Sequence, residues 1–224
     1  MKQILFWSSF SNEVTVEEWR EKEVKLFPAH YLTLESHKRL GHEVQLYTYQ
    51  WIEVWNVPDN VEIRDAGELY DEKLAFDALK RGHSIAHVSD LVRFAAAAQS
   101  GGAVMDMDAV VLREFPEDGF FASSPAKLTG GFAPHWGDAH PPLFISDKSW
   151  DGKALSDFPV GISEDMRHFS FNLSRMIEGV LKEKPKKGSE AWCFVMWEIQ
   201  KNHEKMPKKK VYEPLYFSPL PAWL

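Results

Sequence analysis

The most regular pattern of apolar and polar positions in the chain lies between residues 86 and 112. Its first part predicts a helix, because apolar residues recur there at the three- and four-residue spacing of one helix face. These residues are Val88, Leu91, Val92, Ala95 and Ala96. A hydroxyl at Ser84 or Ser89 can cap the start of this helix by accepting a hydrogen bond from an unpaired amide. Gly101 and Gly102 are expected to end it, since glycine enters the left-handed backbone region without steric cost.

A buried strand is predicted directly after the two glycines. Residues 103–105 and 109–112 are apolar and partly β-branched, which is typical of such a strand. Asp106 and Asp108 lie between them, two positions apart. In an extended chain both side chains therefore point the same way, about 6–7 Å apart. The end of the predicted strand carries two carboxylates on one side.

Four polar residues of this unit are candidates for a binding or catalytic site. Asp90 and Arg93 are three positions apart and share one face of the predicted helix. Asp106 and Asp108 would repel each other unless a cation lies between them. Carboxylate oxygens are hard ligands that suit Mg²⁺ or Mn²⁺, and these ions bind phosphate oxygens in turn. An Asp-x-Asp sequence alone is more often a solvated turn, but the preceding helix, glycines and strand favour a metal site.

The rest of the pattern predicts an α/β domain. Further strands are expected over residues 2–7, 43–49, 61–64, 120–123 and 211–217. Further helices are expected over residues 14–26, 29–40, 71–81, 163–183 and 189–201, with Pro28 interrupting the first two. Strand, helix and strand close together in the sequence favour a parallel pair. Residues 127–142, rich in glycine, proline and histidine, are assigned to a surface loop of the kind that often carries binding residues.

Length and composition restrict the class of protein. The 224 residues suit a single domain, and the net charge of −7 argues against a nucleic-acid partner, for which a basic face is expected. A metal ion can still supply the positive charge that a phosphate compound needs. Cys193 is the one cysteine, which excludes a disulfide within the chain, and we interpret it as a buried apolar residue. No apolar run is long enough for a transmembrane segment or a signal peptide, so a cytoplasmic protein is expected.

The helix, glycines and aspartates together resemble the signature of the DxD-containing sugar transferases. The joint motif reads Ser89-Asp90-x-x-Arg93, then Gly101-Gly102, then Asp106-x-Asp108. This superfamily includes capsular-polysaccharide and yeast-type mannosyl transferases and the glucosylating domains of clostridial toxins. Residues 34–49 and 57–69 resemble further segments of the family. The resemblance implies a single GT-A (Rossmann-like) α/β domain with a central mixed, mainly parallel sheet flanked by helices. Residues 1–112 would form its nucleotide-sugar-binding half, and residues 113–224 the acceptor-binding half with a closing C-terminal loop.

The resemblance also implies roles for the four polar residues. Asp108 would coordinate Mn²⁺ (or Mg²⁺). Asp106 would contact the ribose or the sugar of the donor and reach the ion through water. Asp90 and Arg93 would hold hydroxyl groups of the donor sugar, and the Arg93 side chain would also steady the aspartates. We therefore expect Asp90, Arg93 and Asp106 to be both donor-binding and catalytic.

Residues near the two ends of the chain match further places in the family. Trp7 lies where members carry the aromatic that stacks on the nucleotide base, and Ser8 follows it. In the C-terminal segment, Ser218 would be a metal ligand and Trp223 a contact to the diphosphate. One departure lies before the aspartates, where many members have an aromatic and this chain has Val104.

The acceptor side is less sharply predicted. Asp138 is the nearest candidate for a general base beside an acceptor hydroxyl. Other carboxylates compete with it for this role: Asp147, Asp151, Asp157 and Asp165. Trp136 and His135 are candidates for contacts with an acceptor sugar. His83 and His87 are four apart, but the sequence places no third ligand beside them, which disfavours a zinc site.

The resemblance implies a metal-dependent glycosyltransferase. It would move a hexose or deoxyhexose from a UDP- or GDP-linked donor to a glycan or other hydroxyl acceptor, in glycan or polysaccharide synthesis, with a weak preference for retention. One alternative is a domain that binds a sugar nucleotide without catalysis. Another is a metal-dependent phosphohydrolase, although such sites usually recruit additional ligands for a second ion.

Overall fold

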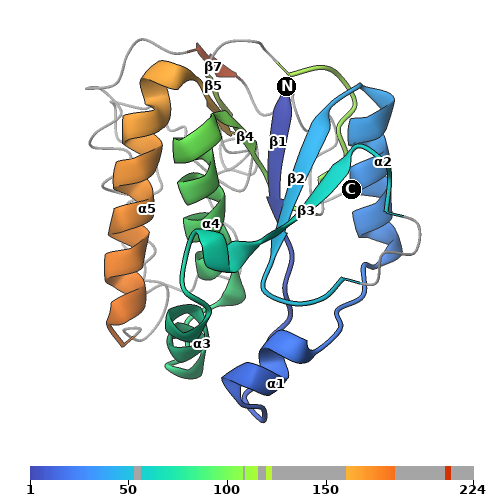
Figure 1. Ribbon diagram of the computed structural model, residues 1–224. Coiled ribbons are helices and arrows are strands. Elements are labelled where there is room, and N and C mark those ends of the chain that lie inside the picture. The colour runs from blue at the N-terminus through green and yellow to red at the C-terminus, as the bar shows by residue number, and fades with distance from the viewer. Residues whose placement is uncertain (53–56, 108, 116–119, 123–159, 185–209, 213–224) are drawn as a thin grey trace, which may run out of the picture.

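The computed structural model describes residues 1–52, 57–107, 109–115, 120–122, 160–184 and 210–212 of the chain. They form a seven-stranded sheet in the order β3-β2-β1-β4-β6-β5-β7. Figure 1 shows α2 on one face of this sheet and α4 and α5 on the other, with α1 and α3 near one edge. The predicted fold class, an α/β domain with a mixed, mainly parallel sheet flanked by helices, is confirmed.

The strands fall into a parallel group and a mixed group. The parallel group consists of β1 (Lys2–Phe6), β2 (Glu43–Thr48), β3 (Val61–Asp65) and β4 (Gly102–Val104). The mixed group consists of β5 (Phe120–Ala122), β6 (Val160–Ile162) and β7 (Lys210–Tyr212). In it, β6 runs antiparallel to both β4 and β5, and β7 runs parallel to β5. The four parallel strands therefore end at one common edge, the lower edge in Figure 1.

Helices connect and cover these strands. They are α1 (Val16–Glu21), α2 (Pro28–Arg39), α3 (Glu72–Lys80), α4 (Ile85–Ser100) and α5 (Arg167–Lys182). Two 3₁₀ turns, Ala66–Glu68 and Glu164–Met166, complete the described elements. No helix among the described residues is both long and apolar enough to cross a lipid bilayer.

Alternation along the strands divides the core into two layers. On β1, Ile4 and Phe6 face α3, α4 and α5, where they pack with residues such as Leu91 and Leu173. Leu5 faces the other way and packs with Leu34 of α2. The two faces of one short strand thus contribute to both cores, which holds the parallel group firmly between the helices.

The helix predicted around residues 86–100 is confirmed, together with its ends. Ser84 is the cap, and its Oγ accepts a hydrogen bond of 3.2 Å from the amide of Ala86, whereas Ser89 lies inside the helix. Gly101 and Gly102 have φ values of 66° and 111°. A Cβ at Gly102 would lie 2.8 Å from the carbonyl oxygen of Lys2, so glycine is required there for close approach to β1.

The strand predicted after the glycines is shorter than expected. β4 ends at Val104, and residues 109–112 are irregular, with Leu112 exposed. The backbone leaves the sheet because α2 binds it instead. The Thr33 hydroxyl donates to the carbonyl of Met107 at 2.9 Å, and the amide of Val111 donates to Ser36 Oγ at 2.9 Å.

Other predicted elements need correction as well. The helix expected over residues 14–26 is confined to α1, and Val24 forms a parallel bridge with Ile52 instead. Pro28 begins α2 rather than interrupting a helix, because the first helical position needs no amide hydrogen. Strand β6 was not predicted, since a three-residue strand containing glycine shows no alternation. The helix predicted over residues 189–201 lies outside the described residues.

Candidate functional site

Side chains that follow the four parallel strands gather at their common carboxyl edge. Trp7 and Ser8 follow β1, Gln50 follows β2, and Asp65 ends β3. Asp106 follows β4, which is the next strand beyond β1. In open α/β sheets ligands bind outside the carboxyl ends of the strands. This edge is therefore the candidate active site.

The centre of the site is a cluster of Asp90, Arg93 and Asp106, here called the acid–arginine cluster. Arg93 Nη2 lies 2.5 Å from Asp90 Oδ1, and Arg93 Nη1 lies 2.7 Å from Asp106 Oδ1. One guanidinium thus joins α4 to the segment after β4. The structure brings these three predicted site residues together, and their roles in donor binding and catalysis stay predictions.

Burial differs sharply within the acid–arginine cluster. The Arg93 side chain is 8% exposed, whereas the Asp106 side chain is 30% exposed. A buried guanidinium has lost hydration, and the two carboxylates help to stabilise its charge. Asp106 lies at the open side of the cluster and can contact a ligand while Arg93 fixes its orientation.

The second part of the site is the turn after β1. Ser8 Oγ donates to Gln50 Oε1 at 2.7 Å, and the Ser9 amide donates to the same oxygen at 2.8 Å. The Trp19 indole Nε1 donates to the Ser9 carbonyl at 2.5 Å. Ser8 is buried together with Gln50 and Trp19. The predicted binding residue Ser8 is thus held in place from both β2 and α1.

Trp7 lies beside the first turn of α2. Its ring centroid is 4.0 Å from that of His30 and 5.9 Å from that of Phe27, in tilted and edge-on arrangements. Its amide donates to the Tyr47 carbonyl at 3.0 Å, which continues the ladder between β1 and β2. Its indole Nε1 is buried and has no hydrogen-bond partner among the described residues. Trp7 therefore lies at the predicted edge with its ring orientation fixed by α2.

An ion-paired group at the ends of β2 and β3 borders the site. The Arg20 guanidinium of α1 binds both carboxylate oxygens of Asp65 and donates to the Tyr49 carbonyl at 2.6 Å. Glu72 lies 3.8 Å away at the start of α3. The hydrogen bond with Asp65 raises the pKa of Arg20, and the hydrogen bond with Arg20 lowers the pKa of Asp65. Burial raises the pKa of the Tyr49 phenol.

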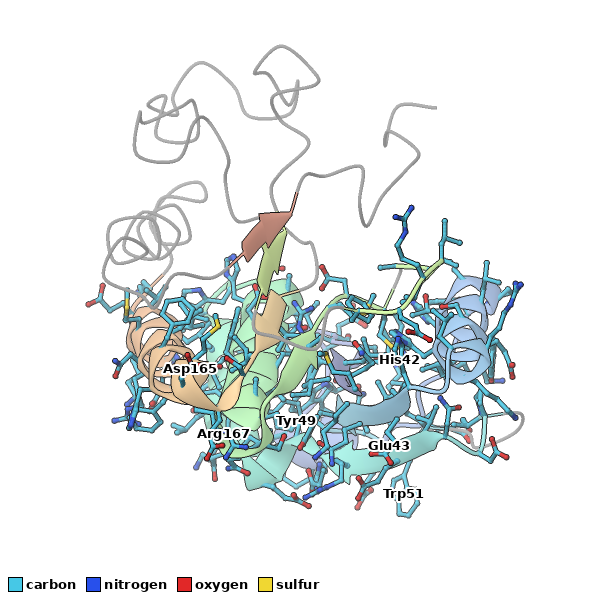
Figure 2. The ribbon with its side chains drawn as sticks, turned by 90° about the horizontal axis from the view of Figure 1, so that it is seen from above. His42, Glu43, Tyr49, Trp51, Asp165 and Arg167 are labelled. Carbon is cyan, nitrogen blue, oxygen red and sulfur yellow. The ribbon has the colours of Figure 1, made fainter. Side chains whose placement is uncertain are left out.

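Several predicted site residues lie outside the described residues. They are Asp108, Asp138, Ser218 and Trp223, together with the alternatives His135, Trp136, Asp147, Asp151 and Asp157. Asp165 is described, and it lies away from the site. It follows β6, which runs antiparallel to β4 and so ends where β4 begins. Figure 2 looks down on that opposite edge, where Asp165, His42 and Glu43 are labelled.

His83 and His87 have packing roles in the described structure. Their ring centroids lie 6.1 Å apart, and His83 Nε2 lies 2.8 Å from the Glu183 carbonyl at the end of α5. Burial, followed by the nearby His83, lowers the pKa of His87. In the part of the chain that the structure describes, no three His, Cys, Asp or Glu side chains are placed to hold a metal ion.

The fit of the site to Mn²⁺ or Mg²⁺ rests on Asp106. Its partly exposed carboxylate supplies a hard oxygen ligand at the carboxyl edge, which suits either ion. The other expected ligands, Asp108 and Ser218, lie outside the described residues. The carboxylate of Asp106 is therefore a suitable ligand for either ion. The complete set of metal ligands stays a prediction.

Sequence reasoning missed the contributions of Gln50 and Arg20. Gln50 directly follows the predicted strand 43–49, so its place at the carboxyl edge was available from the pattern. Its hydrogen-bond partner Ser8 is 42 residues away in the chain, and Asp65 is 45 residues from Arg20. No local spacing rule connects residues at such separations.

Comparisons with known proteins bear on the fold. No protein-family model matches the chain, and no curated protein sequence matches it. Among solved structures, the chain is similar to the PaToxG glycosyltransferase, with a TM-score of 0.50 and 10% sequence identity. The match covers 91% of this chain and 71% of that one. The chain therefore has a GT-A-like glycosyltransferase fold.

Proposed function

We propose that this protein is a metal-dependent glycosyltransferase that uses a nucleoside-diphosphate sugar. The observation that carries the proposal is the acid–arginine cluster at the end of β4, inside a fold shared with a glycosyltransferase. More specifically, we propose that the enzyme transfers a hexose or deoxyhexose from a UDP- or GDP-linked donor to a glycan. We further propose that the transfer retains the configuration of the sugar, serves polysaccharide synthesis and takes place in the cytoplasm.

Each residue of the acid–arginine cluster has a role that follows from its contacts. Arg93 holds Asp90 and Asp106 in fixed positions, because it binds one oxygen of each carboxylate. Fixed carboxylates can accept hydrogen bonds from sugar or ribose hydroxyls without first reorganising. Asp106 is the more exposed of the two. It would therefore be the carboxylate that faces the donor.

The predicted metal would complement this arrangement. Asp106 and Asp108 would hold Mn²⁺ or Mg²⁺, with Ser218 as a third ligand. When bound, the ion would neutralise negative charge on the departing diphosphate. The acid–arginine cluster would orient the sugar, and Trp7 and Ser8 would contact the nucleoside. Asp138 and Trp223 keep their predicted roles as general base and diphosphate contact.

The decisive experiment is binding followed by product analysis. Thermal unfolding is recorded with UDP-, GDP- and other nucleotide sugars, each with Mn²⁺ and with chelator. A ligand present at 100 times its Kd adds about 2.7 kcal/mol to the free energy of unfolding. We expect one nucleotide sugar to raise the Tm in the presence of Mn²⁺ but not in the presence of chelator. On turnover, this donor should release an intact nucleoside diphosphate.

Two variants test whether the acid–arginine cluster is responsible. Asp106→Asn should lower turnover by about a hundredfold or more, because it removes a preorganised charge from the site. Asp59→Asn is the matched control, since Asp59 pairs with Lys38 on the surface. Equal turnover by the Asp106 variant and the wild type would refute the assignment. Release of inorganic phosphate would indicate a phosphohydrolase, and donor binding without turnover a binding domain.

A further inference from the structure

The side-chain amide of Gln50 binds the turn after β1 through both its oxygen and its nitrogen. Its Oε1 accepts hydrogen bonds from the Ser8 hydroxyl at 2.7 Å and the Ser9 amide at 2.8 Å. Its Nε2 donates to Ser9 Oγ at 3.3 Å. Its own amide hydrogen binds Thr48 Oγ1 at 3.1 Å. A buried amide that is satisfied in this way fixes the backbone to which it binds.

The contacts of Gln50 belong to a continuous row across three strand ends. Arg20 binds Asp65 at the end of β3 and the carbonyl of Tyr49, the residue before Gln50. Gln50 then binds the turn after β1, and Trp19 binds the carbonyl of the same turn. The Ser8–Ser9 turn is thus held from β2 on one side and from α1 on the other, before any ligand arrives.

This arrangement determines what Ser8 offers to a ligand. A hydroxyl has one hydrogen, and Ser8 Oγ directs it to Gln50 Oε1 over the shorter of its two contacts. Toward a ligand, Ser8 Oγ is therefore a hydrogen-bond acceptor. Phosphate oxygens at neutral pH are themselves acceptors, whereas a nucleobase N–H or a ribose O–H is a donor.

We propose that Gln50 is a positioning residue for the nucleoside part of the donor, because it fixes the Ser8–Ser9 turn with Ser8 Oγ as an acceptor. The inference rests on the proposed function, since it assumes that a nucleotide occupies this edge. It extends that function by naming the residue that holds the Ser8–Ser9 turn and the hydrogen-bond role that Ser8 Oγ has toward the nucleoside.

The test compares binding of three probes: UDP, GDP and inorganic pyrophosphate, each with Mn²⁺. Gln50→Leu should raise the Kd of the nucleotide that the wild type binds by about tenfold, because the Ser8 hydroxyl and the Ser9 amide lose their acceptor, Gln50 Oε1. Pyrophosphate affinity should stay within about twofold of wild type, because it lacks a nucleoside. In turnover assays, KM for the donor should rise with little change in kcat, as expected for lost ground-state binding.

Gln45→Leu is the matched control. Gln45 is also a buried glutamine of β2, but it lies nearer the start of the strand and donates to Glu62 at 2.9 Å. It should leave nucleotide affinity unchanged. Wild-type nucleotide affinity in Gln50→Leu would overturn the inference, as would an equal loss of pyrophosphate affinity. A wild-type protein that binds neither UDP nor GDP would instead refute the proposed function itself.

A second pair of variants decides the question if Gln50→Leu does not fold. Gln50→Glu keeps the length of the side chain and so keeps an acceptor oxygen where the native Oε1 lies. Gln50→Asn shortens the side chain by one methylene and moves that oxygen away from the turn. The inference predicts that Gln50→Glu binds the nucleotide more tightly than Gln50→Asn. Equal or reversed affinities would contradict it.

Discussion

The acid–arginine cluster and the pair His37–His42 each contain a buried side chain that can carry charge, Arg93 and His37, but they are built in opposite ways. The first lies at the carboxyl edge, where ionised side chains pair with one another at 2.5 and 2.7 Å. The second lies where α2 ends and β2 begins, with the two rings 5.8 Å apart and Phe115 beside them. Charge is concentrated and paired at the candidate site, and avoided in the structural core.

The histidine pair shows how the core treats a titratable group. His37 is completely buried, and neither ring nitrogen has a hydrogen-bond partner among the described residues. Burial, followed by the nearby His42, lowers the pKa of His37 to about 3. Burial also lowers the pKa of His42. Both rings therefore act as neutral packing groups, and the comparison indicates that buried charge among the described residues is a feature of the candidate site.

The largest effect is expected from Arg93→Met, which tests the paired side of the comparison. It removes the cation that binds two partly buried carboxylates, so the free energy of unfolding should fall by about 3–5 kcal/mol. Urea unfolding at neutral pH measures this loss. If the loss is below about 1 kcal/mol, the acid–arginine cluster behaves like a surface ion pair. Its contrast with the His37–His42 pair would then be wrong.

The next largest effect is the loss of folding stability in acid that His37 causes. It tests whether the histidine pair is neutral in the folded protein. The unfolded chain takes up a proton below pH 6.5, and the folded protein does so only near pH 3. Stability from this residue is therefore fully present above pH 6.5 and declines as the pH falls below it. Between pH 7 and pH 5 the loss should be about 2 kcal/mol.

His37→Leu measures this contribution directly. Urea unfolding at pH 7 and pH 5 should show a smaller pH dependence in the variant than in the wild type, by about the same 2 kcal/mol. The variant should fold well, because the His37 ring nitrogens have no partners among the described residues to lose. His168→Leu, at an exposed position of α5, serves as the control. An unchanged pH dependence in His37→Leu would show that His37 takes up its proton over the same pH range in the folded protein as in the unfolded chain.

A smaller effect is expected from Arg20→Met. This variant tests an ion pair whose side chains are more exposed than Arg93 but are still partly buried. The Arg20 side chain is 32% exposed and its partner Asp65 is 42% exposed, so water screens the pair. We expect a loss of about 1 kcal/mol in the free energy of unfolding. The measurement is urea unfolding alongside Arg93→Met. A loss as large as that of Arg93→Met would mean that burial does not set the order of these effects.

The smallest effect is expected from Arg175→Ala. The Arg175 side chain is 62% exposed and pairs at 2.5 Å with Glu178, which is 16% exposed and also pairs with Lys182 at 2.8 Å. Because the Arg175 guanidinium stays in water and Lys182 still neutralises Glu178, stability should change by less than about 0.5 kcal/mol. Thermal unfolding detects a larger change, which would indicate that geometry alone, rather than burial, makes ion pairs strong in this protein.

The amino-acid sequence by itself determined the helix of residues 85–100, its cap at one of two serines, and its glycine end. These features depend on residues within a few positions of one another, where spacing fixes direction. The shared face of Asp90 and Arg93 could be predicted for the same reason, and so could the place of Asp106 just beyond a strand. The parallel strands and their common edge followed from the order of elements.

Tertiary structure alone decided which distant residues meet at that edge. The end of β4 at Val104 depends on two hydroxyls of α2, which bind Met107 and Val111 from 74 and 75 residues away. The binding of Gln50 to Ser8 depends on β1 and β2 being neighbours in the sheet. Periodicity reports on one element at a time, whereas these contacts arise from the packing of several elements together. The sequence therefore indicated which residues could form a site, and the order of strands decided which side chains hold them there.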